Sequence, residues 1–469
     1  MDIHKRLAAL GTAIPRLLLP REGTDLSRWA VIACDQFTQD RSYWERAAAA
    51  AGDGPSALHC IFPEVFLDDP GRTERIGRIH QTMKKYLAES LFNSYRACMY
   101  VERDTAYHRG RRGLVVCLDL ERYDWSADSK PLIRPTEGTV PERLPPRMDA
   151  RRGAALELPH ILVLIDDETD ELLRTLGDRV RTGTPLYDTP LMLDSGRVKG
   201  WLLDREEDWN YLAGGLEKLI SPPRIPHAQD AGGRPRPDQS PPPAERAGNS
   251  PEGSGKFLYA VGDGNHSLAA AKAVWEEYKK TGGTSEGPRW VMAELENLYD
   301  PALAFEPIHR FIFGAGTEEI KKLLAPLAGF SLTRLSGTGA REKLLFLVKE
   351  QVPRTRFGII AGVPGAAPEE AGIFLVEADP LPLALERIQP LLDGFVKDRP
   401  GLSIDYIHGG EELFHLARGS AGTGILLPPF NKRELFRTVA ARGPLPRKSF
   451  SMGEAGEKRF YLECRKLFE

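Results

Sequence analysis

Five consecutive residues, Asp263-Gly264-Asn265-His266-Ser267, combine residue types that suit anion binding and proton transfer. The apolar run 257–262 before them predicts a strand, and the pattern over 268–280 after them predicts a helix. Backbone N–H groups at a helix start carry partial positive charge and favour anions, phosphate above all. A carboxylate such as Asp263 can hold a metal ion or take a proton, and histidine is the residue type that titrates near neutrality. The pattern therefore indicates a phosphate-binding corner between a strand and a helix.

The same five residues also fit a purely structural turn. Gly262 and Gly264 can adopt positive φ, Asp263 is a frequent turn former, and Asn265 or Ser267 can cap the helix. The spacing is neither that of a P-loop nor that of a GxGxxG motif. Spacing alone therefore leaves the anion site and the structural turn equally open.

An arginine-rich segment, 134–147, lies more than a hundred residues before this corner. Guanidinium groups form bidentate, charge-assisted hydrogen bonds with phosphate or carboxylate, so the segment can act as an anion clamp. Glu137 within it can act as a base or as a salt-bridge partner of the arginines. A loop of this composition can equally be a solvated surface. The residues proposed for the clamp are Arg134, Thr139, Arg143 and Arg147.

Two other polar clusters are weaker candidates. His309 and Arg310 supply the complement of an anion site, although a histidine beside an arginine is usually structural. Asp35 and Gln36 follow the apolar segment 29–33, at a strand end where α/β proteins place ligands. The residues after 29–33 can equally serve to cap a following helix.

Two further segments have a distinctive sequence but no predicted catalytic or binding role. Pro159-His160 is expected to lead into a core strand at 161–165. The tail 448–461, which is rich in cationic and aromatic residues, is expected to pack as a terminal arm, although such residues could also close over a site.

Length and composition describe an ordinary globular protein. A chain of 469 residues predicts two or three domains, and 41% hydrophobic with 28% charged residues is typical of globular chains. The net charge of −3 creates no field that would attract nucleic acid. Five scattered cysteines suggest a reducing compartment, and no apolar run reaches the roughly 18 residues of a spanning helix. We therefore expect a cytoplasmic protein with no membrane segment.

Strands and helices alternate in mixed order, which predicts an α+β or mixed α/β fold. Segment 222–256 is rich in Pro, Gly and Ser and almost lacks large apolar residues, so it is expected to be a disordered insertion. The predicted organisation is a main α/β body over 1–221 and 257–314, followed by a C-terminal α/β lobe and terminal arm over 315–469.

Several strings occur in an order that resembles one protein family. They are 29–37 (WAVIACDQF), 63–65 (PEV), the arginine segment, 158–160 (LPH), 261–268 (VGDGNHSL), 305–310 (FEPIHR) and the tail 450–465. The family is the domain-of-unknown-function family 1015, in the branch that carries VGDGNHS, and the resemblance covers nearly the whole chain outside 222–256. Most members carry an ADGHHR-like string at the corner, which is similar to the signature of the ParB/sulfiredoxin-like fold. Ser267 stands where that string has arginine, so a cation from elsewhere must serve any bound phosphate.

The resemblance implies a ParB/sulfiredoxin-like core with an additional α/β lobe. It also implies a phosphotransferase of the free-serine-kinase type, with ATP, ADP or pyrophosphate as donor and magnesium as cofactor. In that hypothesis Gly264, Asn265 and Ser267 lie at the phosphate, and His266 bonds the phosphoryl oxygens. Asp263 holds magnesium and Glu137 accepts the proton of a small hydroxyl substrate, near Asp35 and Gln36.

The alternative is a noncatalytic regulator that binds a nucleotide or another ligand at the same corner. Binding to nucleic acid is disfavoured because helix 268–280 is nearly neutral. The sequence makes no prediction of oligomeric state.

Overall fold

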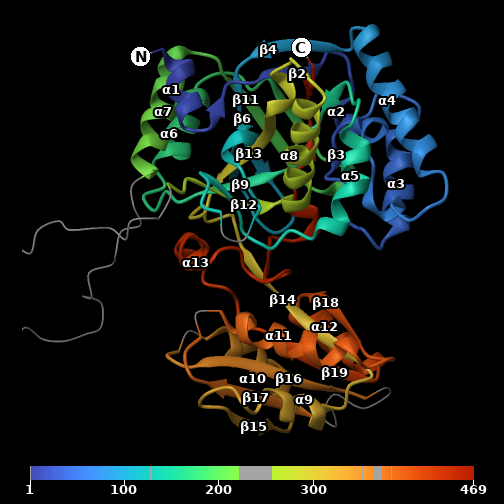
Figure 1. The fold of residues 1–469 in the computed structure, drawn as a ribbon, viewed down its shortest axis with the longest axis vertical. Helices are drawn as coiled ribbons and strands as arrows, with labels where there is room; N and C mark the ends of the chain where they lie inside the picture. The colour runs from blue at the N-terminus through green and yellow to red at the C-terminus, as the bar shows by residue number, and fades with distance from the viewer. Residues whose placement is uncertain are drawn as a thin grey trace, which may run out of the picture. The chain divides into compact units, whose positions relative to one another are not determined.

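A computed structural model describes residues 2–126, 129–220, 256–350, 352–363, 372–381 and 383–468. These residues form helices and mixed sheets, so the predicted α+β class is confirmed (Figure 1). The described chain divides into two compact units. Unit 1 contains Met1–Asp300, Phe436–Gly443 and Arg459–Glu469, and unit 2 contains Pro301–Leu435 and Pro444–Lys458. No described helix has both the length and the apolar character that crossing a membrane requires.

The main sheet of unit 1 has the strand order β10-β11-β5-β6-β13-β9-β12-β7, with β1 paired to β6. Its strands are β1 (Thr12–Ala13), β5 (Cys98–Asp104), β6 (Arg111–Asp119), β7 (Ile133–Pro135), β9 (Leu162–Ile165), β10 (Tyr187–Pro190), β11 (Arg197–Leu203), β12 (Tyr259–Asp263) and β13 (Trp290–Asn297). Three short pairs complete the unit: β2 (Arg16–Pro20) with β4 (Phe92–Arg96), β3 (Val31–Ile32) with β21 (Phe460–Tyr461), and β8 (Leu156–Glu157) with β22 (Arg465–Lys466).

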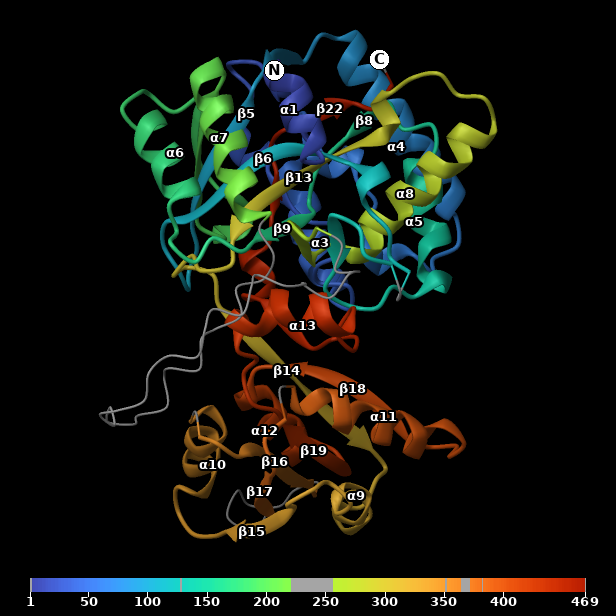
Figure 2. The ribbon, with the colours of Figure 1, turned by 60° about the vertical axis from the view of Figure 1, so that its left-hand side comes forward.

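Helices cover both faces of the main sheet because alternate strand residues point to opposite sides. Val116 packs into one apolar cluster and its neighbours Val115 and Cys117 into the other. One face is covered by α1 (Ile3–Ala9), α6 (Leu172–Val180), α7 (Glu206–Leu219) and α8 (Asn265–Lys280), and the other by α2 (Leu26–Trp29), α3 (Arg41–Ala51) and α4 (Arg72–Ala88). Figure 1 shows α1, α6 and α7 on the opposite side of unit 1 from α3 and α4, and Figure 2 shows α6 and α7 side by side. The helix α5 (Leu144–Arg151) packs beside α8.

The connections of unit 1 contain short 3-10 helices and part of one late α-helix. The 3-10 helices are η1 (Ala57–Cys60), η2 (Glu64–Phe66), η3 (Leu120–Arg122), η4 (Pro141–Arg143), η5 (Met192–Asp194) and η6 (Gly287–Arg289). The late helix is α13 (Leu435–Arg442), whose Phe436 stacks on Phe257 with ring centroids 4.7 Å apart.

A second sheet, with the order β15-β17-β16-β19-β14-β18 and β20 paired to β14, forms the centre of unit 2. Its strands are β14 (Phe305–Phe313), β15 (Ser331–Leu335), β16 (Thr355–Gly362), β17 (Ile373–Ala378), β18 (Ser403–His408), β19 (Gly422–Leu426) and β20 (Phe450–Met452). The remaining elements are α9 (Thr317–Leu324), α10 (Ala340–Lys349), α11 (Ala384–Lys397), α12 (Gly410–Gly419), η7 (Lys432–Glu434) and η8 (Ala455–Glu457). The apolar side chains of α10 and α12 pack on this sheet around Phe311, Leu344 and Leu413.

The units divide the chain differently from the predicted domains at two places. Strand β14, assigned to the main body in the prediction, pairs with β18 and β19 and therefore belongs to unit 2. The tail was grouped with the second lobe, but its strands β21 and β22 pair with β3 and β8 of unit 1. The predicted insertion at 222–256 lies outside the described residues except for Lys256.

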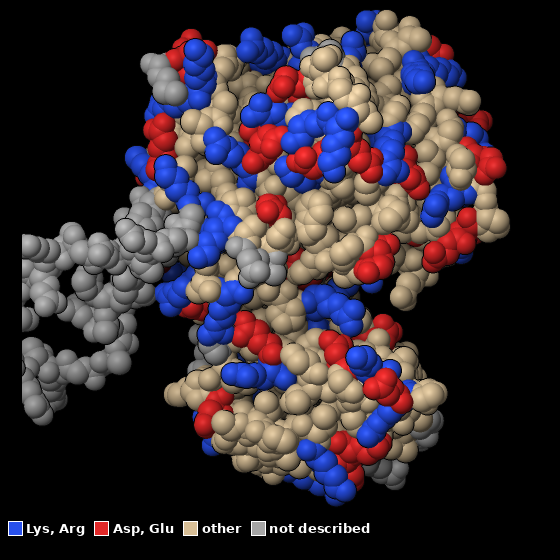
Figure 3. Space-filling view, viewed as in Figure 1, with Lys and Arg blue, Asp and Glu red and all other residues tan. Residues whose placement is uncertain are grey.

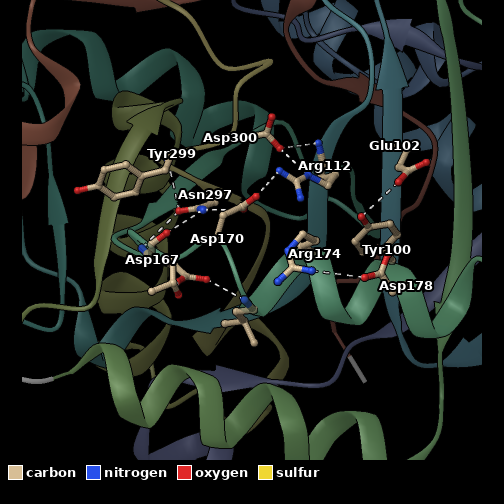
Figure 4. A network of polar contacts seen from close by, with 12 residues as sticks. Tyr100, Glu102, Arg112, Asp167, Asp170, Arg174, Asp178, Asn297, Tyr299 and Asp300 are labelled. Atoms are coloured by element: carbon tan, nitrogen blue, oxygen red, sulfur yellow. Dashed lines mark hydrogen bonds and ion pairs between the residues drawn. The ribbon is translucent and has the colours of Figure 1, made fainter.

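A polar network fixes the edge of the main sheet where β9 and β13 end (Figure 4). Asn297 donates to the carbonyl of Asp167 at 3.0 Å and to the carboxylate of Asp170 at 2.8 Å. Arg112 bridges Asp170 at 2.7 Å and Asp300 at 2.9 Å. Each described carboxylate in these contacts has a hydrogen-bond donor. The network therefore fixes the position of residues up to Asp300, where the chain passes from unit 1 to unit 2.

Charged side chains of both signs are interspersed on the face of unit 1 seen in Figure 3. On α8, Lys279 contacts Glu121 at 2.6 Å and Glu276 at 3.0 Å, and Arg152 of the α5 end contacts Glu277 at 2.8 Å. This alternation is typical of a solvated helix face.

Candidate functional site

The corner predicted from the sequence is formed as a strand, a left-handed glycine and a helix start. Strand β12 ends at Asp263, Gly264 has a φ of 78°, and α8 begins at Asn265. A Cβ at Gly264 would come within 3.2 Å of the Ile161 backbone, so both the φ value and the contact favour glycine. Within the described chain no side chain caps α8, so the expected cap by Asn265 or Ser267 is not formed. The first N–H groups of α8 thus keep their capacity to bind an anion.

The arginine segment runs directly beside this corner. Strand β7 pairs in parallel with β12, with Arg134 opposite Ala260. Thr136 Oγ1 donates to the Val261 carbonyl at 2.6 Å, and the Val140 N–H donates to Nε2 of His266 at 3.2 Å. Two parts of the chain separated by more than a hundred residues therefore form one wall of the site.

The three arginines of that segment differ in what they contact. Arg134 is buried, donates from Nε to the Pro131 carbonyl at 3.0 Å, and has its guanidinium carbon 4.6 Å from the ring centroid of Phe257. Arg143 is exposed. Arg147 is largely buried and forms an ion pair with Glu64. The guanidinium of Arg143 is therefore open to solvent, and that of Arg147 is paired with a carboxylate.

His160 is the centre of a half-buried group of polar side chains. Its Nε2 lies 2.8 Å from Oγ of Ser267 and 4.0 Å from Oδ2 of Asp35. Its Nδ1 lies 2.9 Å from the hydroxyl oxygen of Tyr461, which also accepts the N–H of Cys34 at 3.2 Å. These contacts bring the 29–37 string, the 158–160 string, the corner and the C-terminal tail to one point.

The side chains after β3 continue this group towards Glu64. Gln36 donates from Nε2 to Oδ1 of Asp35 at 3.0 Å, and the Glu64 N–H donates to the Cys34 carbonyl at 2.8 Å. Burial raises the pKa of the Glu64 carboxyl to about 7, the charge of Asp35 adds to the rise, and Arg147 opposes it. Burial also raises the pKa of the Cys34 thiol, so Cys34 is no ready nucleophile.

Other predicted site residues lie around the same corner. Glu137 follows β7 and is half-buried, and Oγ1 of Thr139 is buried two residues later. Oδ1 of Asn265, at the start of α8, is a buried acceptor that lacks a hydrogen bond within the described chain. Asp263 ends β12 beside a bulge in its pairing with β9.

His309 and Arg310, which were predicted to be phosphate ligands, are buried core residues of unit 2. Arg310 is fully buried and donates to Oε1 of Gln389 at 2.8 Å and to the carbonyls of Ile308 and Lys448 at 2.6 and 2.9 Å. Nδ1 of His309 accepts the Leu427 N–H at 3.1 Å. Their polar atoms are used inside that unit, so we leave both residues out of the proposed site.

The carboxylates of the site determine how a magnesium ion could be held. The described residues contain no group of three or more His, Cys, Asp or Glu side chains that could hold a metal ion. Magnesium in nucleotide sites is commonly bound through one or two carboxylates and the substrate phosphates. Asp263 therefore fits a magnesium ion that arrives with a nucleotide, and not one held by the protein alone.

Three residues of this group were missed as site residues by the sequence analysis: Glu64, His160 and Tyr461. Each lies in a string that resembled the family, and that was the available signal. His160 and the tail that holds Tyr461 were expected to be structural, and Glu64 was given no role. Only the folded chain brings His160 and Tyr461 to Asp35 and Ser267, and Glu64 to Cys34.

Comparisons with known proteins agree with the family resemblance. A family model described as Protein of unknown function (DUF1015) matches residues 18–367. No curated protein matches the sequence. Among solved structures, a conserved hypothetical protein from Pyrococcus furiosus is 11% identical with a TM-score of 0.35, covering 75% of this chain and 95% of that one.

Two further solved structures are similar at the same level. Free serine kinase in complex with AMP is 12% identical with a TM-score of 0.36, covering 75% of this chain and 92% of that chain. C-terminally truncated SbnI from Staphylococcus aureus is 10% identical with a TM-score of 0.35, covering 74% and 85%. Likenesses this distant carry no argument about the chemistry of this chain.

Proposed function

This chain belongs to the DUF1015 family of proteins of unknown function, and from its candidate site we propose that it is a phosphotransferase of the free-serine-kinase type. It moves a phosphoryl group from a nucleotide or pyrophosphate to a small hydroxyl compound. The observation that carries the proposal is the contact between the arginine segment and the start of α8, made by the Val140 N–H and His266 at 3.2 Å. That contact joins an uncapped helix start to a segment that carries the exposed Arg143 and the largely buried Arg147, which is paired with Glu64.

Phosphoryl transfer asks mainly for positioning and charge neutralisation. The donor phosphate lies on the N–H groups of Asn265, His266 and Ser267, where the helix dipole favours an anion. Arg143 and Arg147 supply the positive charge that serine at position 267 does not. Asp263 would hold a magnesium ion that arrives with the donor, and such an ion would supply further neutralisation of phosphate charge.

The acceptor hydroxyl needs a base, and two carboxylates are candidates. Glu137 was predicted for this role from its place among the arginines. Glu64 is favoured by its surroundings, because burial raises the pKa of its carboxyl to about 7 and a base works best near the ambient pH. Asp35 and Gln36 are joined by a 3.0 Å hydrogen bond, and in this proposal they bind the polar acceptor.

A noncatalytic regulator that binds a nucleotide or another ligand is the second candidate. One observation favours it: His266 and Ser267 already bond Val140 and His160 within the chain, as they would in a corner that only holds its shape. Such a protein would bind a donor or its product without turning it over.

Phosphorus NMR of the purified full chain separates the two. The protein is incubated with magnesium, with ATP, ADP or pyrophosphate in turn, and with a mixture of serine, other amino acids and polyols. The proposal predicts a new phosphomonoester resonance in step with donor loss. Calorimetric binding of a donor without any such resonance would favour the regulator.

A further inference from the structure

The contact between Ser267 and His160 has the geometry of an activated hydroxyl nucleophile. Oγ of Ser267 lies 2.8 Å from Nε2 of His160, within the range in which a general base accepts a hydroxyl proton. Ser267 is the third residue of α8, so its hydroxyl lies in the helix turn proposed to hold the donor phosphate. The direct transfer described above gives this hydroxyl no role.

The partners of the other ring nitrogen favour the tautomer that such a base requires. The oxygen of Tyr461 accepts the Cys34 N–H at 3.2 Å and lies 2.9 Å from Nδ1 of His160, so it is also within reach of a proton on that nitrogen. Burial raises the pKa of the Tyr461 phenol well above its usual value, so the phenol stays neutral. With its proton on Nδ1, His160 donates to Tyr461, and Nε2 is left to accept from Ser267.

The carboxylate of Asp35 lies close enough to stabilise the positive charge that His160 would acquire. When Nε2 takes the serine proton, the imidazole becomes cationic, and Oδ2 of Asp35 lies 4.0 Å from that nitrogen. Gln36 holds the other oxygen of Asp35 through a 3.0 Å hydrogen bond. Ser267, His160 and Tyr461 thus supply a nucleophile, a base and a group that orients the base, the three parts of nucleophilic catalysis.

We propose that Ser267 is a covalent phosphoryl acceptor, activated by His160, and that the chain transfers phosphate through a phosphoserine intermediate. This inference rests on the proposed function. In the first half, Oγ of Ser267 forms a bond to the donor phosphorus, the bond from phosphorus to the ADP, AMP or phosphate leaving group breaks, and Nε2 of His160 takes the serine proton. In the second half, the acceptor oxygen attacks the phosphorus and its proton passes to Glu64. The bond from phosphorus to Oγ then breaks, and His160 returns its proton to the serine.

The phosphoserine would be stabilised where it forms. A phosphate on a residue in the first turn of a helix interacts favourably with the helix dipole and with nearby N–H groups. Arg147 of α5, the helix that packs beside α8, adds positive charge. The intermediate therefore accumulates when donor is supplied without acceptor.

The test supplies donor alone and locates the phosphate. The full chain is incubated with magnesium and ATP labelled in its γ-phosphate, or with labelled pyrophosphate, then quenched in acid, digested and mapped by mass spectrometry. We expect acid-stable phosphate on the peptide that contains Ser267, and its release when the acceptor mixture is added. The S267A variant should incorporate none, and H160Q should incorporate it about 10²–10⁴-fold more slowly.

Matched variants control for unrelated losses. Ser94, in β4, and His415, in α12, are exposed residues outside this group, so S94A and H415Q should behave as wild type. Melting temperatures show whether each variant is folded, and the peptide map of the wild-type chain locates the phosphate without any variant. Wild-type turnover by a folded S267A protein would overturn the intermediate and leave the phosphotransferase standing. Donor that gives neither phosphoserine nor product with the wild-type chain would overturn both.

Discussion

Glu64 is surrounded by groups that act in opposite directions on its proton affinity. Burial is the largest influence and raises the pKa of the carboxyl, Arg147 lowers it, and Asp35 raises it. The resulting value of about 7 is above the 4.5 of a solvated glutamate. As pH rises through 7, the group changes from a protonated acid to a carboxylate that can accept a proton. Glu137, on the arginine segment, serves as the comparison.

Replacing Glu64 with glutamine is expected to change the pH dependence of catalysis. For the wild-type chain, kcat/KM should rise about tenfold per pH unit below 7 and level off above it, because only the carboxylate accepts the proton. The E64Q variant should lose this rise and fall to a rate about 10²–10⁴-fold lower. E137Q should keep the wild-type profile. A profile that E64Q leaves unchanged and E137Q removes would transfer the role to Glu137.

At the scale of elements, the turn between β12 and α8 depends on two separate demands of Gly264. The first is its φ of 78°, which costs an L-residue roughly 1–2 kcal/mol. The second is the close approach of Ile161. Gly282 offers a matched control, because it has the same φ of 78° and no atom lies within 4 Å of the place that a Cβ would take.

Alanine at Gly264 should therefore destabilise unit 1 more than alanine at Gly282. The extra cost of G264A is expected to be about 1–3 kcal/mol, the range for overpacking a tight site. Urea unfolding of the two variants gives the difference directly. Equal losses would mean that Ile161 yields to the added methyl group.

Strand β21, in the C-terminal tail, contacts His160 through the hydroxyl group of Tyr461. Changing Tyr461 to phenylalanine keeps the ring packing but removes the oxygen that lies 2.9 Å from Nδ1 and 3.2 Å from the Cys34 nitrogen. Y461F should lower kcat more than tenfold while leaving the Kd of the donor within twofold, because the phosphate does not touch this residue. Y95F, on β4, is the control. A change in donor affinity with kcat preserved would contradict this positioning role.

The elements around the corner were predictable where local pattern decides them. The apolar run before Asp263 and the helical pattern after Ser267 became β12 and α8. The apolar segment 29–33 became only the short strand β3, and polar residues follow it as expected. The helix start was less well predicted, because Gly264 takes the N-cap position without a side-chain bond. The group around His160 was beyond local pattern, since its partners are 107 residues away at Ser267 and 301 residues away at Tyr461.

At the scale of the whole molecule, the chain enters unit 2 after Asp300 and returns twice to unit 1. Alternation of strands and helices predicted the fold class, since it depends on short-range periodicity. The boundaries were missed because they depend on strand pairing: β14 joins β18 and β19, whereas β21 and β22 join strands near the N-terminus. Pairing across such distances leaves no mark in the local sequence.

Unit 2 is expected to be sensitive to acid through His309. Burial lowers the pKa of this imidazole to about 3, from 6.5 in a solvated chain. Between pH 6.5 and about 3, His309 is protonated in the unfolded chain but not in the folded unit. The free energy of unfolding therefore decreases as the pH is lowered through this range. At pH 5 the loss from this residue is about 2 kcal/mol.

H309N keeps an acceptor for the Leu427 N–H but removes the titrating ring. Between pH 7.5 and 5, the variant should lose about 2 kcal/mol less unfolding free energy than the wild-type chain, measured by urea unfolding at each pH. Comparing pH values within one protein cancels the cost of the substitution itself. Parallel losses in the two proteins would show that the ring is not the group that resists protonation.

The claim that a phosphoryl donor binds at the start of α8 is tested most directly by a crystal structure of the full chain grown with pyrophosphate or ADP and magnesium. The account predicts phosphate oxygens about 2.7–3.2 Å from the backbone nitrogens of residues 265–267, with Arg143 or Arg147 turned towards them. A donor bound elsewhere on the chain, with its phosphates away from these nitrogens, would contradict it.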